Sequence, residues 1–502
     1  MLLTQETKLE KEPKSGTGSP HNVLFADTLA HDVKADKLHE ECGVFAIFAK
    51  KGVAVAQAAY HGLIALQHRG QESSGIVVND CGLIDYHKGM GLVSEVFNKD
   101  VLKKLQGQAA IGHVRYSTSG GSVNENTQPL VMRYIKGVLA IAHNGNLTNA
   151  MELRQELEHR GAIFQTTIDS EVIAYLIARE RINSHNIETA IQRAMTQLKG
   201  AYSLVVMSPR KIIAARDPKG FRPLCMGKTE DGAIVFASES CALDACGAEF
   251  VRDVEPGEIV ICNEKGTRSI KANCGETAAH CIFEYIYFAR SDSTIDGISV
   301  YESRKAAGME LAKQHPVDAD LVIGVPESGL DAAIGYAEQS GIPYEKGLVK
   351  NSYIGRTFIQ PEQNQRTSAV RLKLNALRSV VAGKRIVMLD DSIVRGTTMR
   401  RIVTMLRDSG ATEVHLRISS PEFCWPCFYG TDIPSKEELI ANNYTVEQIA
   451  EMLDADSLGF LNKNSLDSLL CGREIPYCSA CFCGEYPDGI ITKFMSKDDK
   501  YL

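Results

Sequence analysis

The stretch that decides the fold of the C-terminal half is Val387-Met388-Leu389-Asp390-Asp391-Ser392-Ile393-Val394-Arg395-Gly396-Thr397-Thr398. An apolar strand delivers two adjacent carboxylates to its carboxyl end, and a Gly-Thr-Thr turn then opens a helix. The free N–H groups of a helix N-terminus are suited to bind a phosphate. Adjacent aspartates can meet vicinal hydroxyls or Mg²⁺, which prefers oxygen ligands. An ordinary strand-to-helix turn with an Asp cap is the alternative, and Asp-Asp-Ser alone would fit it.

The residues around this stretch repeat the order strand, loop, helix, strand. The first unit comprises a strand at 320–325, a loop at 326–329, a helix ending near Gly341 and a strand from Ile342. The second comprises strand 385–389, helix 399–407 and strand 413–418. This order predicts a parallel α/β sheet that binds its ligands at the carboxyl ends of the strands.

The twelve-residue string resembles the signature of the type I phosphoribosyltransferases, which bind phosphoribosyl pyrophosphate (PRPP). The resemblance implies that Asp390 and Asp391 contact the ribose hydroxyls and one Mg²⁺ ion. It also implies that residues 395–398 surround the 5′-phosphate; these are Arg395, Gly396, Thr397 and Thr398.

Two further segments match the same family. Pro326-Glu327-Ser328-Gly329 resembles its pyrophosphate loop, with Ser328 near the Mg²⁺, although the family usually has Asp where Glu327 stands. Residues 350–358 resemble its mobile lid, in which Lys350 would bind PRPP by offsetting substrate charge.

The N-terminal half has a different pattern. Short apolar runs at 137–142, 202–207 and 233–236 are bounded by Gly, Asn, Asp or Pro and predict strands. Helical spacing is present at 151–160 and 171–180. Stacked sheets with flanking helices are expected.

Five motifs in this half resemble the glutaminase domain of the N-terminal-nucleophile (Ntn) amidotransferases, an αββα sandwich. In order along the chain they are 42–45 (Cys-Gly-Val-Phe), 66–75 (Leu-Gln-His-Arg-Gly-Gln-Glu-Ser-Ser-Gly), 112–118 (Gly-His-Val-Arg-Tyr-Ser-Thr), 143–147 (His-Asn-Gly-Asn-Leu) and 169–171 (Asp-Ser-Glu).

The chemistry of that family assigns a role to each motif. The thiolate of Cys42 would attack the side-chain amide of glutamine, with its own α-amine as the base, so cleavage before Cys42 is required. Asn144 and the Gly145 N–H are the implied oxyanion donors. Arg115 would bind the carboxylate of glutamine and Asp169 its ammonium. A Cys-His dyad is the alternative, but we expect His68, His113 and His143 to be structural.

Fourteen cysteines in 502 residues are too few for a disulfide scaffold and need another explanation. Cys478-Ser479-Ala480-Cys481 is a C-x-x-C motif in an extended tail, which favours a metal site over a redox dithiol. Sets of four thiolates suit Zn²⁺ or an iron–sulfur cluster, and spacing does not decide between them.

The family resemblance does distinguish between zinc and an iron–sulfur cluster. One branch of the amidotransferases carries a 4Fe-4S cluster on cysteines in these contexts, which implies Cys281, Cys427, Cys478 and Cys481 as its ligands. Three nearby cysteines fall outside that pattern and are excluded: Cys424, Cys471 and Cys483. A structural role for the cluster is expected.

The composition of the chain limits the cellular compartment and the binding partners that we expect. With a formal net charge of −7, a nucleic-acid or anionic-membrane partner is not expected. No run approaches the ~18 apolar residues of a membrane span. Residues 1–41 lack the apolar core of a secretory signal, so we expect a cytoplasmic protein with a removable leader. The expected domains are 42–276, the glutaminase, and 277–502, the phosphoribosyltransferase with its iron–sulfur tail.

Together, the two resemblances imply an amidotransferase that uses PRPP as the acceptor, in the branch with a propeptide and an iron–sulfur cluster. Glutamine and PRPP would give 5-phosphoribosylamine, glutamate and pyrophosphate, opening purine (IMP) synthesis. The family further implies a homotetramer and inhibition by purine nucleotides. Two alternatives are another Ntn amidotransferase, such as glucosamine-phosphate synthase, and a non-catalytic PRPP-sensing regulator.

Overall fold

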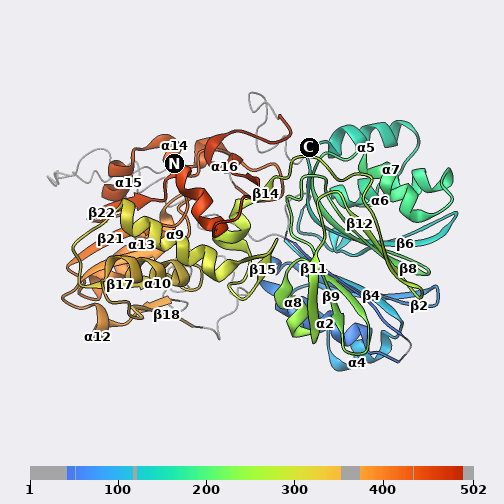
Figure 1. The fold of residues 1–502 in the computed structure, drawn as a ribbon, viewed down its shortest axis with the longest axis horizontal. Coiled ribbons are helices and arrows are strands. Elements are labelled where there is room, and N and C mark those ends of the chain that lie inside the picture. Colours follow the sequence, from blue (N-terminus) through green and yellow to red (C-terminus); the bar gives the residue numbers. More distant parts are fainter. Residues whose placement is uncertain (1–41, 51, 117–120, 352–373, 434, 490–502) are drawn as a thin grey trace, which may run out of the picture.

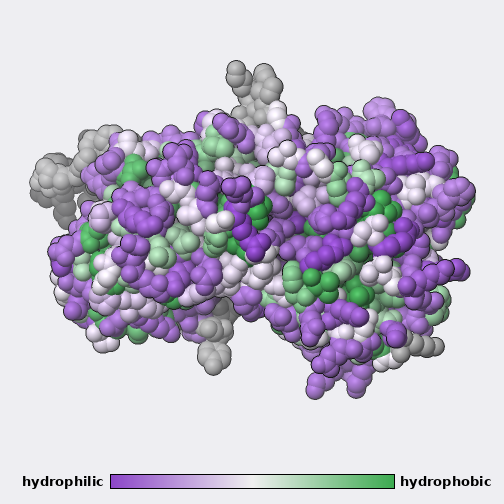
Figure 2. Space-filling model, in the orientation of Figure 1, coloured by the Kyte–Doolittle hydropathy of each residue, from purple (hydrophilic) through white to green (hydrophobic). Residues whose placement is uncertain are grey.

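The computed structural model describes residues 42–50, 52–116, 121–351, 374–433 and 435–489. Two lobes lie side by side (Figure 1): the N-terminal half of the chain, coloured blue to green, forms one, and the C-terminal half, coloured yellow to red, forms the other. The surface in Figure 2 is mainly hydrophilic over both lobes. No helix in the described ranges is long and apolar enough to cross a bilayer.

Two antiparallel sheets stack in the N-terminal lobe. The first has the order β11-β9-β10-β1-β4-β2-β3 and the second β13-β12-β8-β7-β6-β5. Their strands are β1 (Gly43–Phe48), β2 (Ser73–Asp80), β3 (Leu83–Met90), β4 (Ala109–Arg115), β5 (Leu130–Tyr134), β6 (Gly137–Leu147), β7 (Gly200–Ser208), β8 (Lys211–Arg216), β9 (Cys225–Thr229), β10 (Ile234–Ala237), β11 (Ala248–Asp253), β12 (Ile259–Asn263) and β13 (Gly266–Ile270).

Side chains along these strands point alternately to the two faces of each sheet, and the lobe therefore has three apolar layers. Val44 and Ala46 of β1 pack with Ala140 and Ala142 of β6 between the sheets. On the outer face of the first sheet, Phe45 and Ile47 pack on helices of that side. The helices of this lobe are α2 (Val55–Ala65), η1 (Gln67–Arg69), α3 (Val93–Val96), α4 (Lys99–Lys104), η2 (Asn124–Asn126), α5 (Ala150–His159), α6 (Asp169–Ile182), α7 (Ile187–Met195) and α8 (Ser240–Ala245).

Helices α5, α6 and α7 pack on the outer face of the second sheet, while α2 and α8 cover that of the first. The lobe is therefore an αββα sandwich, as the sequence predicts. Its two expected helices correspond to α5 and α6.

The C-terminal lobe is built on a parallel sheet of order β17-β20-β21-β22. Its apolar strands are buried on both faces, which is the pattern of a parallel sheet covered by helices. Val322 and Val387 face helices α9 and α10, whereas Ile323 and Met388 face α13. The expected parallel α/β sheet is confirmed.

The elements of this lobe are β14 (His280–Cys281), η3 (Glu284–Phe288), β15 (Thr294–Ile295), β16 (Ile298–Ser299), α9 (Val300–Gln314), β17 (Leu321–Gly324), α10 (Gly329–Ser340), β18 (Leu348–Lys350), β19 (Leu374–Ala376), α12 (Arg378–Val381), β20 (Arg385–Asp390), α13 (Thr397–Asp408), β21 (Glu413–Ile418), η4 (Lys436–Glu438), α14 (Ile440–Asn443), α15 (Val446–Met452), β22 (Ser457–Phe460), η5 (Lys463–Leu470), β23 (Tyr477–Cys478) and α16 (Ala480–Cys483).

The sequence predicts a strand from Ile342, and this prediction is wrong. Only Tyr344 makes an isolated bridge, to Val322, and the next strand is β18, which pairs with β19 in a separate two-stranded sheet. Pro343 lacks an N–H group and cannot donate to a ladder, which explains why an apolar stretch after Gly341 does not continue the main sheet.

Candidate active sites

Cys42 directly precedes β1, the central strand of the first sheet. Its side chain is buried, and its Sγ donates to the carbonyl of Tyr116 at 3.4 Å. The carbonyl oxygen of Cys42 accepts a hydrogen bond from Nε of Arg69 at 3.2 Å. Glu41 and the rest of the expected leader lie outside the described residues. Cys42 is thus held at the start of β1 by groups from two other segments, one on its thiol and one on its backbone carbonyl.

Asn144 and Gly145 lie in β6, in the second sheet. Both polar atoms of the Asn144 side chain are buried, and neither has a hydrogen-bond partner in the described part of the chain. A buried amide is normally paired, so an unpaired one at this position is available to a ligand. Gly145 has φ +137°, and a Cβ there would lie 2.2 Å from the carbonyl oxygen of Ala201. Only glycine fits this position.

Arg115 ends β4 and Asp169 begins α6, and both are buried. Arg115 donates to the carbonyl of Gly121 at 3.3 Å. Asp169 accepts from the Leu147 N–H at 2.9 Å. Burial works to raise the pKa of Asp169, but the nearby His143 and several hydrogen bonds outweigh it and lower that pKa. Asp169 is therefore an ionised carboxylate, suited to bind a cation. Ser117 and Thr118 of the motif lie outside the described residues.

The three motif histidines bond to other groups. His68 pairs with Glu239 at 2.7 Å, and His113 Nε2 contacts the carbonyl of His143 at 2.9 Å. His143 Nδ1 contacts the hydroxyl of Ser170 at 3.1 Å. Burial lowers the pKa of His113 to about 3, so its ring is neutral. These contacts fit the structural role expected of the histidines.

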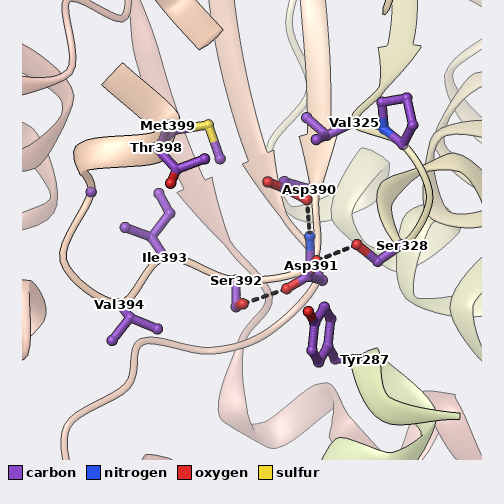
Figure 3. Close-up of a pocket in the computed structure, with 12 residues that line it drawn as sticks. Tyr287, Val325, Ser328, Asp390, Asp391, Ser392, Ile393, Val394, Thr398 and Met399 are labelled. Atoms are coloured by element: carbon purple, nitrogen blue, oxygen red, sulfur yellow. Dashed lines mark hydrogen bonds between the residues drawn. The ribbon is translucent and has the colours of Figure 1, made fainter. Parts of the chain in front are cut away.

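A second site lies where β17 and β20 end side by side (Figure 3). Asp390 is the last residue of β20, and the Asp391 N–H donates to its carboxylate at 3.0 Å. The hydroxyls of Ser328 and Ser392 both donate to the Asp391 carboxylate. The pocket is lined by Tyr287, Val325, Pro326, Ser328, Asp390, Asp391, Ser392, Ile393, Val394, Gly396, Thr398 and Met399.

The N-terminus of helix α13 lies at this pocket, where an anion can bind. Gly396 is its N-cap in the left-handed region, with φ +84°, and no side chain among the described residues caps the helix. The N-terminus of α13 carries the positive end of the helix dipole, and Gly396 and Thr398 at this end line the pocket. Carboxylates, serine hydroxyls and a helix N-terminus in one pocket suit a phosphorylated sugar with a divalent cation.

Three residues expected at the PRPP site do not line the pocket. Arg395 pairs with Glu438, and Thr397 opens α13 next to Thr398. Lys350 lies 3.8 Å from Glu327. The rest of the expected lid, 352–358, lies outside the described residues. Tyr287, which sequence reasoning missed, lines the pocket from η3, about one hundred residues before the loop; no local motif marks it.

Four cysteines line one apolar cavity next to the junction of the lobes: Cys281, Cys427, Cys478 and Cys481. Parallel pairing of β14 with β23 sets Cys281 opposite Cys478. Aromatic walls come from Phe221, Phe283, Tyr429 and Tyr486. The three excluded cysteines, Cys424, Cys471 and Cys483, do not line this cavity.

The four thiols share one cavity, and Cys481 interacts electrostatically with the other three. Among the described residues, no three His, Cys, Asp or Glu side chains are close enough to hold a single metal ion. Burial raises the pKa of Cys478 to about 12, so without a cation that thiol stays protonated. Four thiols around one cavity are a donor set of the kind that Zn²⁺ or an iron–sulfur cluster takes.

The fold and the two sites define a glutamine amidotransferase joined to a phosphoribosyltransferase. A glutamine amidotransferase domain model matches residues 113–245, and a phosphoribosyl transferase domain model matches 299–419. Amidophosphoribosyltransferase of Bacillus subtilis is 52% identical over 462 residues, covering 90% of this chain and 95% of its own. The enzyme of that name from Methanocaldococcus jannaschii is 50% identical over 461 residues, covering 89% and 97%.

A solved structure gives the same result. Glutamine PRPP amidotransferase of B. subtilis, complexed with ADP and GMP, superposes with a TM-score of 0.83 at 50% identity, covering 89% of this chain and 97% of that one. The chain belongs to the amidophosphoribosyltransferase family, whose members catalyse the first committed step of purine biosynthesis.

Proposed function

We propose that the chain transfers the amide nitrogen of glutamine to C1 of PRPP through the residues described above. One observation carries this assignment: the buried, unpaired Asn144 amide lies beside Gly145 on one chain with the two-aspartate pocket. A hydrolase of glutamine alone has no need of that pocket, and a PRPP-binding regulator has no need of Asn144, Cys42 or Arg115.

The first half-reaction takes place at Cys42. The thiolate adds to the amide carbon of glutamine, and the oxyanion formed is bound by the Asn144 amide and the Gly145 N–H. The C–N bond breaks as the nitrogen takes a proton, and ammonia leaves. Water then hydrolyses the thioester to glutamate. Arg115 and Asp169 hold the α-carboxylate and ammonium of the substrate.

The base in this step is the α-amine of Cys42, with a pKa near 7.7–8.0 in a free N-terminus. In the complete chain that nitrogen is an amide and cannot accept a proton. Removal of residues 1–41 is therefore required, leaving domains at 42–276 and 277–502.

In the second half-reaction, ammonia attacks C1 of PRPP and pyrophosphate departs. Ser328, Asp390 and Asp391 would hold one Mg²⁺, which supplies charge neutralisation for the leaving group when bound. Asp391 is buried and receives two serine hydroxyls, so its orientation is fixed before substrate binds. Gly396 and Thr398, with Arg395, Thr397 and Lys350, would contact the phosphates.

The four cysteines of the cavity would hold a 4Fe-4S cluster, placing the chain in the branch that carries one. The shared apolar cavity that these four cysteines line supports a common metal site. The cluster would be structural, because it joins β23 of the tail to β14 at the start of the second lobe.

We also propose that purine nucleotides inhibit this enzyme and that the chain forms a homotetramer. A structure 50% identical to this chain, with a TM-score of 0.85 and coverage of 92% of this chain, is described as the allosteric regulatory enzyme of purine biosynthesis. The B. subtilis relative was solved with ADP and GMP.

Stoichiometry tests the function. Leader-free protein is incubated with glutamine, PRPP and Mg²⁺, and glutamate and pyrophosphate are counted. We expect equal yields, with pyrophosphate release lost when both glutamine and ammonia are omitted. Glutamate formed without any pyrophosphate would identify a glutaminase that serves another acceptor.

A further inference from the structure

Strand β6 extends beyond the ladder that it forms with β5. That ladder ends at the pair Leu130 and Ile141, and the same register, continued along both strands, sets Gln128 opposite His143. Here the bond comes from a side chain: Oε1 of Gln128 accepts from the N–H of His143 at 2.9 Å, and both residues are buried. The Gln128 amide thus takes the place of a paired strand on this edge of β6.

The backbone of His143 is held on both sides of its Cα atom. Gln128 binds its N–H, and Nε2 of His113 contacts its carbonyl oxygen at 2.9 Å. That carbonyl belongs to the peptide bond that joins His143 to Asn144. Because both contacts are buried, they limit how far the backbone can move where β6 presents Asn144 and Gly145.

A second bond of this kind lies further along β6. The N–H of Leu147 donates to the Asp169 carboxylate at 2.9 Å. The two N–H groups that side chains bind, those of His143 and Leu147, therefore flank Gly145 in the sequence. The part of β6 that carries the oxyanion donors is fixed at both of its ends.

The segment that carries Gln128 is itself bound to the first sheet. Nζ of Lys88, on β3, donates to the carbonyl of Thr127 at 2.6 Å and lies 3.5 Å from that of Pro129. Gly75, which pairs with Lys88, lies against the same segment, since a Cβ there would come within 2.3 Å of the Gln128 carbonyl oxygen. Contacts from β2 and β3 thus set the position from which Gln128 reaches β6.

We propose that Gln128 is a positioning residue for the oxyanion donors Asn144 and Gly145, and that Lys88 holds Gln128 in place. The inference rests on the proposed function of these two donors. An oxyanion donor acts only when it lies about 2.7–3.1 Å from the developing charge, so a small shift of β6 weakens it. The loss falls on the transition state, in which the oxyanion exists, and not on the binding of glutamine.

The test uses leader-free Gln128→Met, which nearly keeps the length of the side chain but removes its acceptor, and Gln128→Glu, which restores an acceptor oxygen. Asn79→Leu is the matched control. Asn79 is also 4% exposed and also joins the two sheets, because its Nδ2 donates to the carbonyl of Ser208 at 3.0 Å, but it lies near the opposite end of β2 from Gly75.

Four quantities are measured for each protein. They are kcat for glutamine, KM for glutamine, the rate of synthesis from ammonia, and the inhibition constant of an aldehyde analogue of glutamine. The Cys42 thiolate adds to the aldehyde carbon, and the carbonyl oxygen becomes the oxyanion of a tetrahedral adduct. The inhibition constant of the aldehyde therefore reports the oxyanion donors directly, which a general loss of stability would not do.

For Gln128→Met we expect kcat with glutamine to fall at least ~10-fold, with KM for glutamine and ammonia-dependent synthesis within about threefold of native. The inhibition constant of the aldehyde should rise by a factor similar to the loss of kcat/KM. Gln128→Glu should recover at least ~3-fold of the lost kcat. Lys88→Met should change kcat in the same direction as Gln128→Met, and it decides the question if Gln128→Met does not fold. Asn79→Leu should match the native protein.

A kcat within about twofold of native in both Gln128→Met and Lys88→Met would overturn the positioning role. An unchanged inhibition constant of the aldehyde in Gln128→Met, no recovery in Gln128→Glu, or an equal loss in Asn79→Leu would overturn it too. A native protein that makes no glutamate at all contradicts the proposed function itself, whereas an active native protein with unaffected variants contradicts only the role of Gln128.

Discussion

The side-chain amide of Asn146 donates to the carbonyl oxygen of Phe428 at 3.0 Å, across 282 positions of sequence. It ties β6, the strand that carries Asn144 and Gly145, to the loop that follows Cys427. Next to it, Gly430 packs against Gly145, where a Cβ would come within 3.3 Å of the Gly145 carbonyl carbon. The oxyanion strand is therefore held from the second lobe as well as from its own sheet.

Replacing Asn146 by Ala should weaken this connection. The Phe428 carbonyl would be left buried without that donor, which costs about 1–3 kcal/mol of unfolding free energy. Urea unfolding measures the loss. The control is Asn98→Ala, which removes an exposed helix cap of α4 within the first lobe. A more stable Asn146→Ala protein would show that the bond contributes nothing net.

The unpaired Asn144 amide should act only on the glutamine half-reaction. Asn144→Ala is expected to lower kcat with glutamine by about 10²–10³-fold, the usual effect of losing an oxyanion donor. Synthesis from ammonia should stay near the native rate, because the PRPP pocket is untouched. Steady-state kinetics with each nitrogen source separate the two. Equal losses with both sources would place Asn144 outside the glutaminase chemistry.

His113 should make the fold sensitive to mild acid. Its pKa is lowered to about 3 by burial, whereas an unfolded histidine titrates near 6.5. The unfolded state therefore binds more protons below pH 6.5, and the stabilisation that His113 provides at neutral pH is lost as pH falls toward 3. Between pH 7 and 5 this loss is about 2 kcal/mol.

His113→Gln should remove that part of the pH dependence, measured as the difference in urea unfolding free energy between pH 7 and pH 5. His185→Gln, at an exposed position, is the control and should retain the native difference. An unchanged pH dependence in His113→Gln would mean that the buried ring is not the source.

The two cysteines of Cys424-Trp425-Pro426-Cys427 should behave differently, because only Cys427 lines the cavity. Protein purified without oxygen should hold ~4 iron and ~4 sulfide per chain. Cys427→Ser should lose most of the iron and unfold at a lower temperature, whereas Cys424→Ser should keep it. Iron analysis and thermal unfolding of the two variants test this difference. Zinc found in place of iron would contradict the assignment of an iron–sulfur cluster.

Local signals explain what could be predicted from the sequence. The strand, two carboxylates and Gly-Thr-Thr turn of 387–398 are contiguous, so their chemistry and their place at a strand end follow from the order of residues alone. The αββα sandwich was likewise predictable, from its motifs. Tyr287 was not, because it lines the pocket from a turn about one hundred residues before the loop, and that turn has no phosphate or nucleophile pattern of its own.

The strand predicted after Gly341 was wrong because the local sequence pattern was misleading. Apolar residues there suggested a continuing sheet, but Pro343 removes a ladder donor and the chain leaves the sheet after one bridge. The role of Arg395 in binding PRPP stays a prediction: its neighbours line the pocket, while Arg395 pairs with Glu438, a residue from a later segment.

The nucleophile is the central claim, and Cys42→Ala in leader-free protein tests it most directly. Phosphoribosylamine formation is measured with glutamine and with ammonia, beside Cys262→Ala, a buried cysteine in the core of the same sandwich. We predict that Cys42→Ala loses glutamine-dependent synthesis and keeps ammonia-dependent synthesis, while Cys262→Ala keeps both. Glutamine-dependent synthesis that survives in Cys42→Ala would contradict the assignment.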